Sequence, residues 1–222
     1  LDGSGNVVFR DAAGNIILIA KPSNIQSLVI NGSDGDDEVT MDWGVVESIG
    51  GPSAITINLG DGFDTLVINQ GDGAPEVMSF NHANATDGNI RDQAGNTLTF
   101  NGLDPIIDHT VAATKVFNFG GGADTIVLSA DGDGAAGNGY SFIDSDLAES
   151  VSFLNPTTSL IIEGELLADN MTLGALDTPL AGTFTGLIVT GYDTYDAVGS
   201  VVFTSDDGSA DTFTVTPASY PI

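Results

Sequence analysis

The sequence contains no cysteine, and only two of its 222 residues are histidine. Without cysteine there is no disulfide framework, which small secreted eukaryotic domains usually carry, so a bacterial exoprotein fits better. The absence of cysteine is also compatible with the cytosol. The two histidines, His82 and His109, have no cysteine partners at the spacing of zinc ligands, so we expect both to lie in surface loops. These shortages argue against disulfide-rich and zinc-binding proteins.

Positive charge is equally scarce. The chain has four lysine and arginine residues against 31 aspartate and glutamate residues, which gives a formal net charge of −27. Nucleic-acid binding takes much of its affinity from cationic contacts to phosphate, so this composition argues against it, and also against binding to anionic membranes. No apolar run approaches the roughly 18 residues of a membrane-spanning helix. The serine nucleophile motif G-x-S-x-G is also absent from the sequence.

What the chain has in abundance is glycine, with 29 residues, together with β-branched and aromatic residues in short runs. This mixture predicts many short strands joined by tight turns, in an all-β fold. A chain of this length commonly forms one domain in such folds. We expect a short helical turn between Ile143 and Ser152, and no long amphipathic helix.

One unit recurs along the chain: a β-type run, a turn of small residues, an aspartate and a second β-type run. The turn, the aspartate and the following run occupy residues 35–39, 62–66, 122–126, 167–171 and 209–213. Three of these aspartates, Asp37, Asp124 and Asp211, recur at equal intervals. Such internal repetition is typical of stacked repeat proteins, so we expect these three residues to lie at equivalent corners of the fold.

Longer segments repeat as well. Residues 10–15, Arg-Asp-Ala-Ala-Gly-Asn, return at residues 91–96 with one substitution. The triplet Glu-Ser-Ile at residues 47–49 returns as Glu-Ser-Val at residues 149–151. Because these matches occur in the same order along the chain, they indicate duplication of a larger unit.

The simplest interpretation is a single domain, residues 1–222, that contains two full copies and a partial third. The copies span approximately residues 1–86, 87–185 and 186–222. They differ by insertions, so the loops vary while the strands persist. The chain begins at Leu1 inside a repeat, and we expect it to be a piece of a longer chain, either processed or excised.

A right-handed parallel β-helix, or β-solenoid, accounts best for this pattern. Similar segments recur at long and variable spacing, as coils with loop insertions would. The turns are richer in Gly and Asp than a two-residue hairpin needs, and apolar residues occupy equivalent places in each copy. Antiparallel β-sandwich repeats are the alternative fold. The Cys–Trp–Cys pattern of immunoglobulin-type sandwiches is absent, and the single tryptophan, Trp43, lies outside any such frame.

Two of the acidic turns resemble a known motif. Gly60-Asp61-Gly62-Phe63-Asp64-Thr65-Leu66 and Gly120-Gly121-Gly122-Ala123-Asp124-Thr125-Ile126 look like the G-x-G-x-D-x-apolar half of the calcium-binding nonapeptide of RTX proteins. RTX nonapeptides follow one another in tandem, whereas these two copies are far apart in the chain. Calcium could therefore be shared between them only if the fold stacks the turns.

A wider resemblance covers most of the chain. Residues 101–108 and 155–162 resemble the repeat regions of very large bacterial extracellular and surface proteins, of the planctomycete and marine type. In such families the modules are β-helical and are associated with adhesion or cell-surface structure. The resemblance therefore implies an extracellular or cell-surface location.

Calcium is the best-motivated ligand of the acidic turns. It takes about 6–8 oxygen ligands from carboxylates, backbone carbonyls and water, and glycine-rich turns can point carbonyls inward. A bound divalent ion would also remove the repulsion between neighbouring carboxylates. The alternative is that ordinary Asp-Gly turns keep a β-rich protein soluble. The candidate metal ligands are Asp34, Asp36, Asp37, Asp61, Asp64, Asp124, Asp131, Asp133, Asp206, Asp207 and Asp211.

The sequence as a whole predicts a non-enzymatic, extracellular structural or adhesive repeat module, with calcium as a candidate stabilising ion. Its expected partners are surface glycans or further copies within a larger chain, without nucleic acid and without membrane insertion. A carbohydrate-binding or polysaccharide-degrading β-helix protein is the alternative, because paired carboxylates can hydrolyse glycosides. Sugar sites usually need aromatic platforms, and the plausible ones here are Trp43, Tyr140, Tyr192 and Tyr195.

Overall fold

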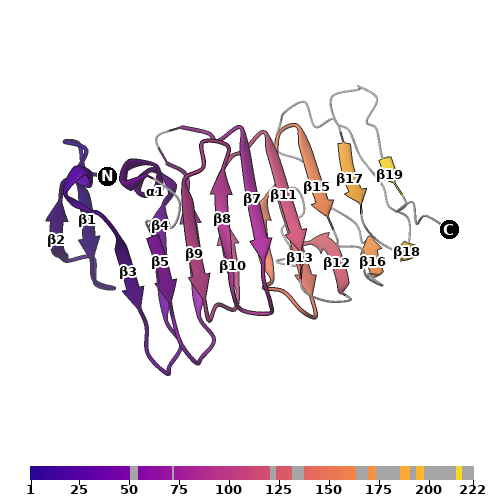
Figure 1. Ribbon diagram of the computed structural model, residues 1–222, viewed down its shortest axis with the longest axis horizontal. Coiled ribbons are helices and arrows are strands. Elements are labelled where there is room, and N and C mark those ends of the chain that lie inside the picture. Colours follow the sequence, from indigo (N-terminus) through magenta and orange to yellow (C-terminus); the bar gives the residue numbers. More distant parts are fainter. Residues whose placement is uncertain are drawn as a thin grey trace.

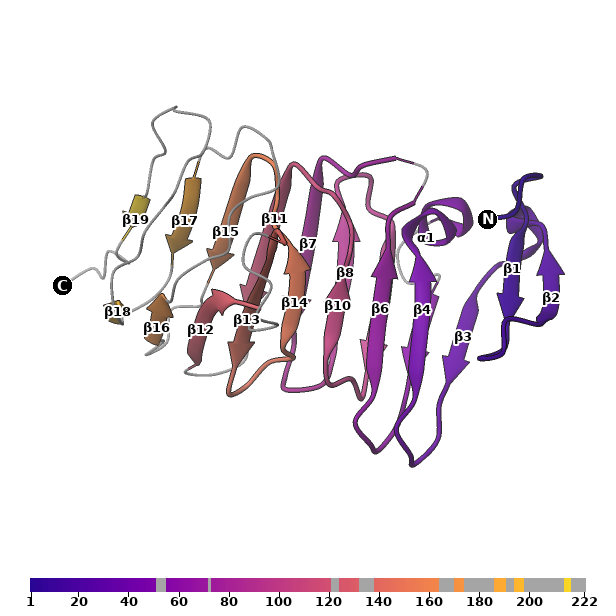
Figure 2. The same ribbon diagram turned by 180° about the vertical axis from the view of Figure 1, so that it is seen from behind.

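The computed structural model shows an elongated β structure, in which two large sheets face each other along the length of the molecule (Figures 1 and 2). The chain runs from the end that carries β1 and β2 to the end that carries β18 and β19, with local reversals of strand order at β7–β9 and β12–β14. No helix among the described residues is long and apolar enough to cross a membrane. The structure describes residues 1–50, 55–71, 73–120, 124–131, 138–163, 170–173, 186–190, 194–197 and 214–216.

The first sheet is nine-stranded over the described residues. Neighbouring strands are parallel except at β8, which runs antiparallel to both β7 and β9. In spatial order its strands are β3 (Leu28–Asn31), β5 (Ile55–Asn58), β9 (Thr97–Asn101), β8 (Gly88–Asp92), β7 (Val77–His82), β11 (Thr114–Phe119), β15 (Ser159–Glu163), β17 (Gly186–Thr190) and β19 (Thr214–Thr216).

The second sheet is eight-stranded over the same part of the chain. Its strands are also parallel to their neighbours, except that β13 runs antiparallel to β12 and β14. In spatial order they are β4 (Glu38–Asp42), β6 (Thr65–Asn69), β10 (Ile106–Asp108), β14 (Val151–Leu154), β13 (Tyr140–Ser145), β12 (Thr125–Ala130), β16 (Asn170–Leu173) and β18 (Thr194–Ala197).

Three smaller elements complete the described fold. A separate antiparallel hairpin of β1 (Val7–Arg10) and β2 (Ile16–Ala20) lies at the N-terminal end and is followed by the 3₁₀ turn η1 (Pro22–Asn24). A short helix, α1 (Trp43–Ile49), follows β4. The helical turn predicted between Ile143 and Ser152 is wrong, because Ile143 pairs with Val151 across the antiparallel ladder of β13 and β14.

Alternation of buried and half-buried residues gives each central strand an inward face. In β9, Leu98 and Phe100 are fully buried, while the residues on either side of them are half-buried. Phe80 and Phe117 stack between neighbouring strands of the nine-stranded sheet, with ring centroids 4.8 Å apart. Phe117 also contacts Phe153 of the eight-stranded sheet at a centroid distance of 4.8 Å. The inward faces of the two sheets therefore share one apolar core.

Asparagine side chains connect strands that stack in register. Asn31, Asn58 and Asn101 are direct partners across β3, β5 and β9. The Asn58 amide donates to Asn31 Oδ1 at 3.0 Å, and the Asn101 amide donates to Asn58 Oδ1 at 2.6 Å. A second asparagine ladder crosses β8, β7 and β11. Such ladders form where strands place the same residue at the same level, because a carboxamide can both donate and accept.

The prediction of an all-β fold is confirmed, and the two large sheets are mixed in strand direction. One pairing pattern occurs twice. Strands β3 and β4 pair in parallel with β5 and β6, and β11 and β12 pair in parallel with β15 and β16. The strands on either side of the Asp37 turn thus pair in the same way as β11 and β12, the strands on either side of the Asp124 turn.

Candidate functional site

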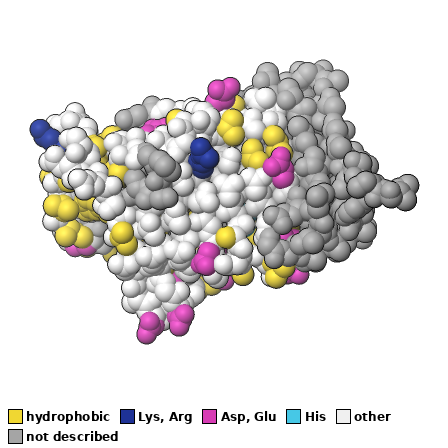
Figure 3. All heavy atoms as spheres, viewed as in Figure 1, with side chains coloured by type: hydrophobic (Ala, Val, Ile, Leu, Met, Phe, Trp, Pro, Cys, Tyr) yellow, Lys and Arg dark blue, Asp and Glu magenta, His cyan; other side chains and the backbone are white. Residues whose placement is uncertain are grey.

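Two acidic turns lie side by side at one edge of the molecule. We call them the acidic edge: residues 32–37 between β3 and β4, and residues 59–64 between β5 and β6. Figure 3 shows acidic side chains at the projecting tip that these turns form in Figure 1. The turns approach so closely that a Cβ added to Gly60, whose φ is +104°, would lie 2.4 Å from the Ser33 carbonyl oxygen. Glycine is required here by both space and conformation.

Carboxylates in each turn accept hydrogen bonds from the backbone of the other turn. The N–H of Phe63 donates to Asp36 Oδ1 at 3.0 Å, and the N–H of Asp37 donates to Asp64 Oδ1 at 2.8 Å. The two turns therefore brace each other reciprocally. Because these bonds have an ionised acceptor, they are stronger than bonds between neutral groups.

The structure brings together five of the predicted metal ligands at this edge. Of these, Asp64 is almost fully buried at 1 % exposure and Asp37 is half-buried. The exposed members are Asp34, Asp36 and Asp61.

The other predicted ligands lie elsewhere. Asp124 is buried immediately before β12 and accepts a hydrogen bond from Ser145 Oγ at 3.2 Å, while Asp131 is half-buried at the end of the same strand. The remaining ones, Asp133, Asp206, Asp207 and Asp211, lie outside the described residues.

The predicted corner positions can be compared for two of the three aspartates. Asp37 and Asp124 each stand directly before a strand of the eight-stranded sheet, β4 and β12. They differ in burial, since Asp124 is 1 % exposed and Asp37 is half-buried. The strand that follows Asp211, β19, belongs to the nine-stranded sheet instead.

The described aspartates do not by themselves form a ready-made calcium site. No group of three or more Asp, Glu, His or Cys side chains among the described residues is arranged to hold a metal. At the acidic edge, Asp36 and Asp37 use a carboxylate oxygen to bind backbone N–H groups. The Asp64 Oδ2 atom, in contrast, is buried and has no hydrogen-bond donor. Among the carboxylate oxygens of the acidic edge, it alone is buried without a hydrogen-bond partner.

A second polar cluster, which the sequence reasoning missed, lies inside the core. Lys115 and Asp108 are both fully buried, and Lys115 Nζ contacts Asp108 Oδ2. The backbone N–H and the hydroxyl of Thr110 donate to Asp108 Oδ1 at 2.9 and 2.7 Å. The alternation of β11 carried a signal, because it places Lys115 on the same face as Phe117 and Phe119.

Burial shifts the proton affinity of groups at this cluster. It lowers the pKa of Lys115, although the neighbouring Asp108 carboxylate acts in the opposite direction. Burial also raises the pKa of Tyr140, with a further contribution from the charge of Asp108. The Tyr140 hydroxyl lies 2.6 Å from Nδ1 of His109, which is half-buried.

The prediction that His82 lies in a surface loop is wrong. His82 is the last residue of β7, is 5 % exposed and stacks on Phe119 at a centroid distance of 5.0 Å. Neither ring nitrogen has a hydrogen-bond partner. Burial lowers the pKa of His82 to about 4, so the ring is a neutral part of the core at pH 7.

The aromatic residues expected to serve as sugar platforms are not exposed where the structure describes them. Trp43 is fully buried, and its Nε1 donates to Asp92 Oδ2 at 3.3 Å. Tyr140 is half-buried beside His109. The side chains of Tyr192 and Tyr195 lie outside the described residues.

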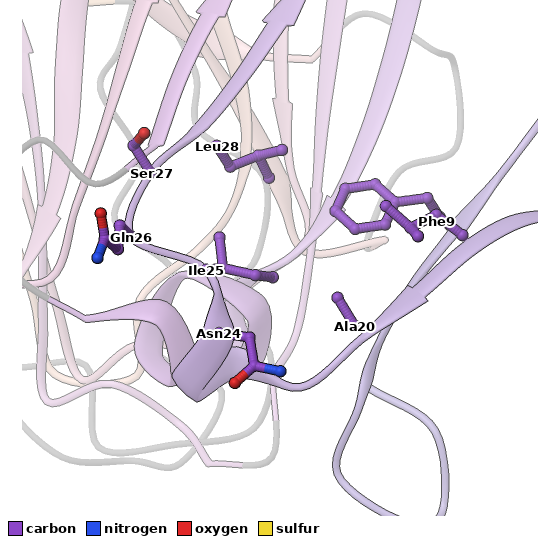
Figure 4. A pocket seen from close by; sticks show the side chains of 8 residues that line it. Phe9, Ala20, Asn24, Ile25, Gln26, Ser27 and Leu28 are labelled. Carbon is purple, nitrogen blue, oxygen red and sulfur yellow. The ribbon is translucent and has the colours of Figure 1, made fainter.

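An open pocket of about 430 Å³ lies between the β1–β2 hairpin and the start of β3 (Figure 4). None of its lining residues is acidic, basic or histidine, so the pocket offers no group for acid–base catalysis. The residues that line it are Phe9, Leu18, Ala20, Asn24, Ile25, Gln26, Ser27 and Leu28.

Strand β2, which forms one wall of this pocket, carries four consecutive exposed apolar side chains. Ile17 is 69 % exposed, and its neighbours Ile16, Leu18 and Ile19 are each just over half exposed. Figure 3 shows hydrophobic side chains gathered at this end of the molecule. An exposed apolar strand of this kind is a typical contact surface for another protein segment.

The chain matches no protein-family model, no curated protein and no solved structure. The function proposed below therefore rests on the residues and geometry of the chain itself.

Proposed function

We propose that this chain is a non-enzymatic structural or adhesive repeat module of an extracellular or cell-surface protein, built as a right-handed β-solenoid. The observation that carries the proposal is the asparagine ladder of Asn31, Asn58 and Asn101, in which each side chain binds its equivalent on the next strand. A ladder of this kind is expected where successive coils stack at the spacing of neighbouring strands. In such a stack each coil repeats the surface of the one before it.

The acidic edge supports the same interpretation. Its two turns belong to successive coils and are held together by reciprocal carboxylate–amide bonds. A scaffold built in this way offers rows of similar groups rather than one concave site, which suits a structural or adhesive role better than catalysis. The buried Trp43 also removes one of the aromatic platforms that the alternative sugar-processing function would need.

Self-association within a larger chain is part of the proposal. In a solenoid, the strands at each end of the stack have unpaired backbone edges. Among the described strands, β3 and β4 are terminal in their sheets at one end, and β19 and β18 at the other. The exposed apolar strand β2 lies next to the first of these ends (Figure 2). Neighbouring modules would cover these surfaces.

The second part of the proposal is that calcium binds at the acidic edge. The buried, unpartnered Asp64 Oδ2 atom and backbone carbonyls of the facing turn would provide oxygen ligands, and the exposed Asp61 would add charge. A ligand that binds only the folded state at about 100 times its Kd stabilises that state by about 2.7 kcal/mol. We therefore expect millimolar calcium to raise the melting temperature more than sodium chloride of equal ionic strength does.

The experiment compares melting temperatures in EGTA, in calcium and in matched sodium chloride. The double variant Asp61→Asn/Asp64→Asn keeps the acceptor oxygens of the turn and should abolish the calcium increment. The matched control Asp2→Asn/Asp11→Asn changes two turn aspartates of the N-terminal segment, the half-buried Asp2 and the exposed Asp11, and should leave the increment unchanged. If calcium acts no more strongly than sodium, the acidic turns are solubility devices and calcium is removed from the proposal.

The absence of catalysis is tested separately. A panel of polysaccharides is incubated with the protein, and reducing ends and unsaturated products are measured, while a glycan array measures binding. The proposal predicts no turnover. Turnover that disappears on substitution of a specific pair of aspartates would favour the enzyme alternative instead.

A further inference from the structure

We propose that Lys115 and Asp108 condense to an intramolecular isopeptide bond that joins the two sheets through the core. The proposal concerns a covalent modification and is independent of the proposed function. It starts from the unusual position of the two residues. Each occupies an inward position in a strand where the alternation calls for an apolar side chain, in β11 for Lys115 and in β10 for Asp108.

The surroundings of the pair exclude water. Within the sheets, Lys115 lies between Met78 and Leu160, which are 0 and 1 % exposed. Asp108 lies between two further buried residues, Ile68 and Phe153, of the eight-stranded sheet. The ring centroid of Phe153 is 5.7 Å from Lys115 Nζ. An ion pair surrounded by buried side chains has lost its hydration, which costs several kcal/mol per ion. Conversion to a neutral amide removes both charges.

The geometry supplies what an acyl-transfer step needs. The nucleophile, Lys115 Nζ, is already in contact with the carboxyl group of Asp108, and reactants held in contact have high effective concentrations. The Thr110 N–H and hydroxyl both point at Asp108 Oδ1. These two donors would stabilise the negative charge that develops on Oδ1 in the tetrahedral intermediate. The other oxygen, Oδ2, faces the amine and is the leaving group.

The condensation balances without any other reagent. Nζ bonds to Cγ of Asp108, and the bond from Cγ to Oδ2 breaks. Two of the three protons of the Lys115 ammonium leave with Oδ2 as one molecule of water, and the third stays on the amide nitrogen. Burial lowers the pKa of Lys115, which favours the neutral amine that makes the attack.

The test is the intact mass of the full-length folded protein. The proposal predicts a mass lower than the sequence mass by one water. After denaturation, trypsin should fail to cleave between Lys115 and Val116, because an acylated lysine is not a substrate. A wild-type protein with its full sequence mass and normal cleavage at Lys115 would overturn the proposal.

Two variants test the leaving group and the nucleophile of the condensation. In Asp108→Asn the leaving group is ammonia, so the mass deficit should become that of ammonia instead of water. Lys115→Arg retains a positive charge but lacks the amine nucleophile, so it should have its full mass. Aspartates followed by glycine can also lose water, by forming succinimides. A water deficit that persists in Lys115→Arg would therefore also overturn the proposal.

A further variant covers the case in which Lys115→Arg does not fold. Lys115→Met/Asp108→Leu fills both positions with apolar side chains, which commonly preserves folding when a buried ion pair is replaced. It should fold, as judged by circular dichroism, and should have its full mass and no cross-link. A water deficit in this variant would contradict the assignment to these two residues.

Discussion

Two hairpins of this molecule contain nearly the same turn and lie in opposite environments. In the β1–β2 hairpin, Asp11 accepts hydrogen bonds from the backbone and side chain of Asn15 at 2.8 and 2.9 Å. In the β8–β9 hairpin, Asp92 accepts the same two bonds from Asn96 at 3.0 and 2.8 Å. The turn is therefore specified by its own five residues, whatever lies around it.

The strands that follow the two turns differ in burial. Ile17 and Leu98 each stand two residues after the turn asparagine, yet Ile17 is 69 % exposed and Leu98 is fully buried. Strand β9 lies between β5 and β8 inside the nine-stranded sheet, whereas β1 is the only partner of β2 in the part of the chain that the structure describes. A short repeated sequence can thus fix a turn, but the neighbouring strands decide which side chains enter the core.

The largest difference in unfolding free energy between the two hairpins is expected when an apolar side chain is truncated to alanine. Leu98→Ala should lower the free energy of unfolding by about 3–4 kcal/mol, because it removes a fully buried side chain and leaves a cavity. Ile17→Ala should change it by less than about 0.5 kcal/mol, since that side chain is mostly in water. Urea denaturation measures both. Equal losses would show that β2 is covered in solution and would break the comparison.

The turn aspartates should differ by a smaller amount. Asp92→Ala removes the acceptor of the buried Trp43 Nε1 group, and a buried donor left without a partner costs about 1–3 kcal/mol. Asp11→Ala affects an exposed turn alone and should cost much less. Fluorescence of Trp43, the single tryptophan, monitors the melts. Comparable shifts for the two variants would mean that the Trp43–Asp92 bond does not stabilise the fold.

The second repeated segment allows a comparison that depends on pH. Glu149 is 2 % exposed, and burial together with the nearby charge of Asp104 raises its pKa to about 9, whereas Glu47 is half-buried on α1. The unfolded chain ionises this group near pH 4.5, so Glu149 destabilises the fold increasingly as the pH rises from 4.5 to 9.

Glu149→Gln should therefore have no effect below pH 4.5 and should stabilise the protein by about 2 kcal/mol at pH 6. Thermal melts at the two pH values measure the difference, and the gain should continue to grow toward pH 9. The control variant Glu47→Gln changes the same residue type at the half-buried position and should give a smaller, flatter response. A pH-independent effect of Glu149→Gln would contradict the assigned burial of this carboxyl group.

The sequence predicted the all-β class and, where the structure describes them, the acidic turns at residues 32–37 and 59–64, because both depend on local composition. It could not predict that Glu-Ser-Ile at residues 47–49 lies on a helix while Glu-Ser-Val at residues 149–151 leads into a strand, because that depends on which strands lie alongside. The expectation that His82 lies in a surface loop failed for a similar reason, because its stacking partner Phe119 comes from a neighbouring parallel strand.

The candidate sites were predicted to different extents. The composition of the acidic turns pointed to Asp36 and Asp64, but their reciprocal bonds arise only when the two turns stack. The Lys115–Asp108 pair was accessible in principle, since period-two alternation places both residues inward. The sequence does not show that the two residues meet, because β10 and β11 belong to different sheets whose facing positions depend on the fold.

Strands far apart in the sequence stack in register along the two sheets. Because the chain has no cysteine, a pair of introduced cysteines can test that register without background. Thr56 and Thr99 are direct partners in β5 and β9, and both are half-buried on the outward side. Neighbouring strands lie about 4.8 Å apart, within the Cα separations that a disulfide spans.

The measurement is disulfide formation under mild oxidation, read by non-reducing electrophoresis and intact mass. Thr56→Cys/Thr99→Cys should cross-link readily, and the control Thr56→Cys/Thr97→Cys, displaced by two residues in β9, should not. Equal cross-linking of both pairs, or cross-linking of the control alone, would contradict the stacked register on which the proposed function rests.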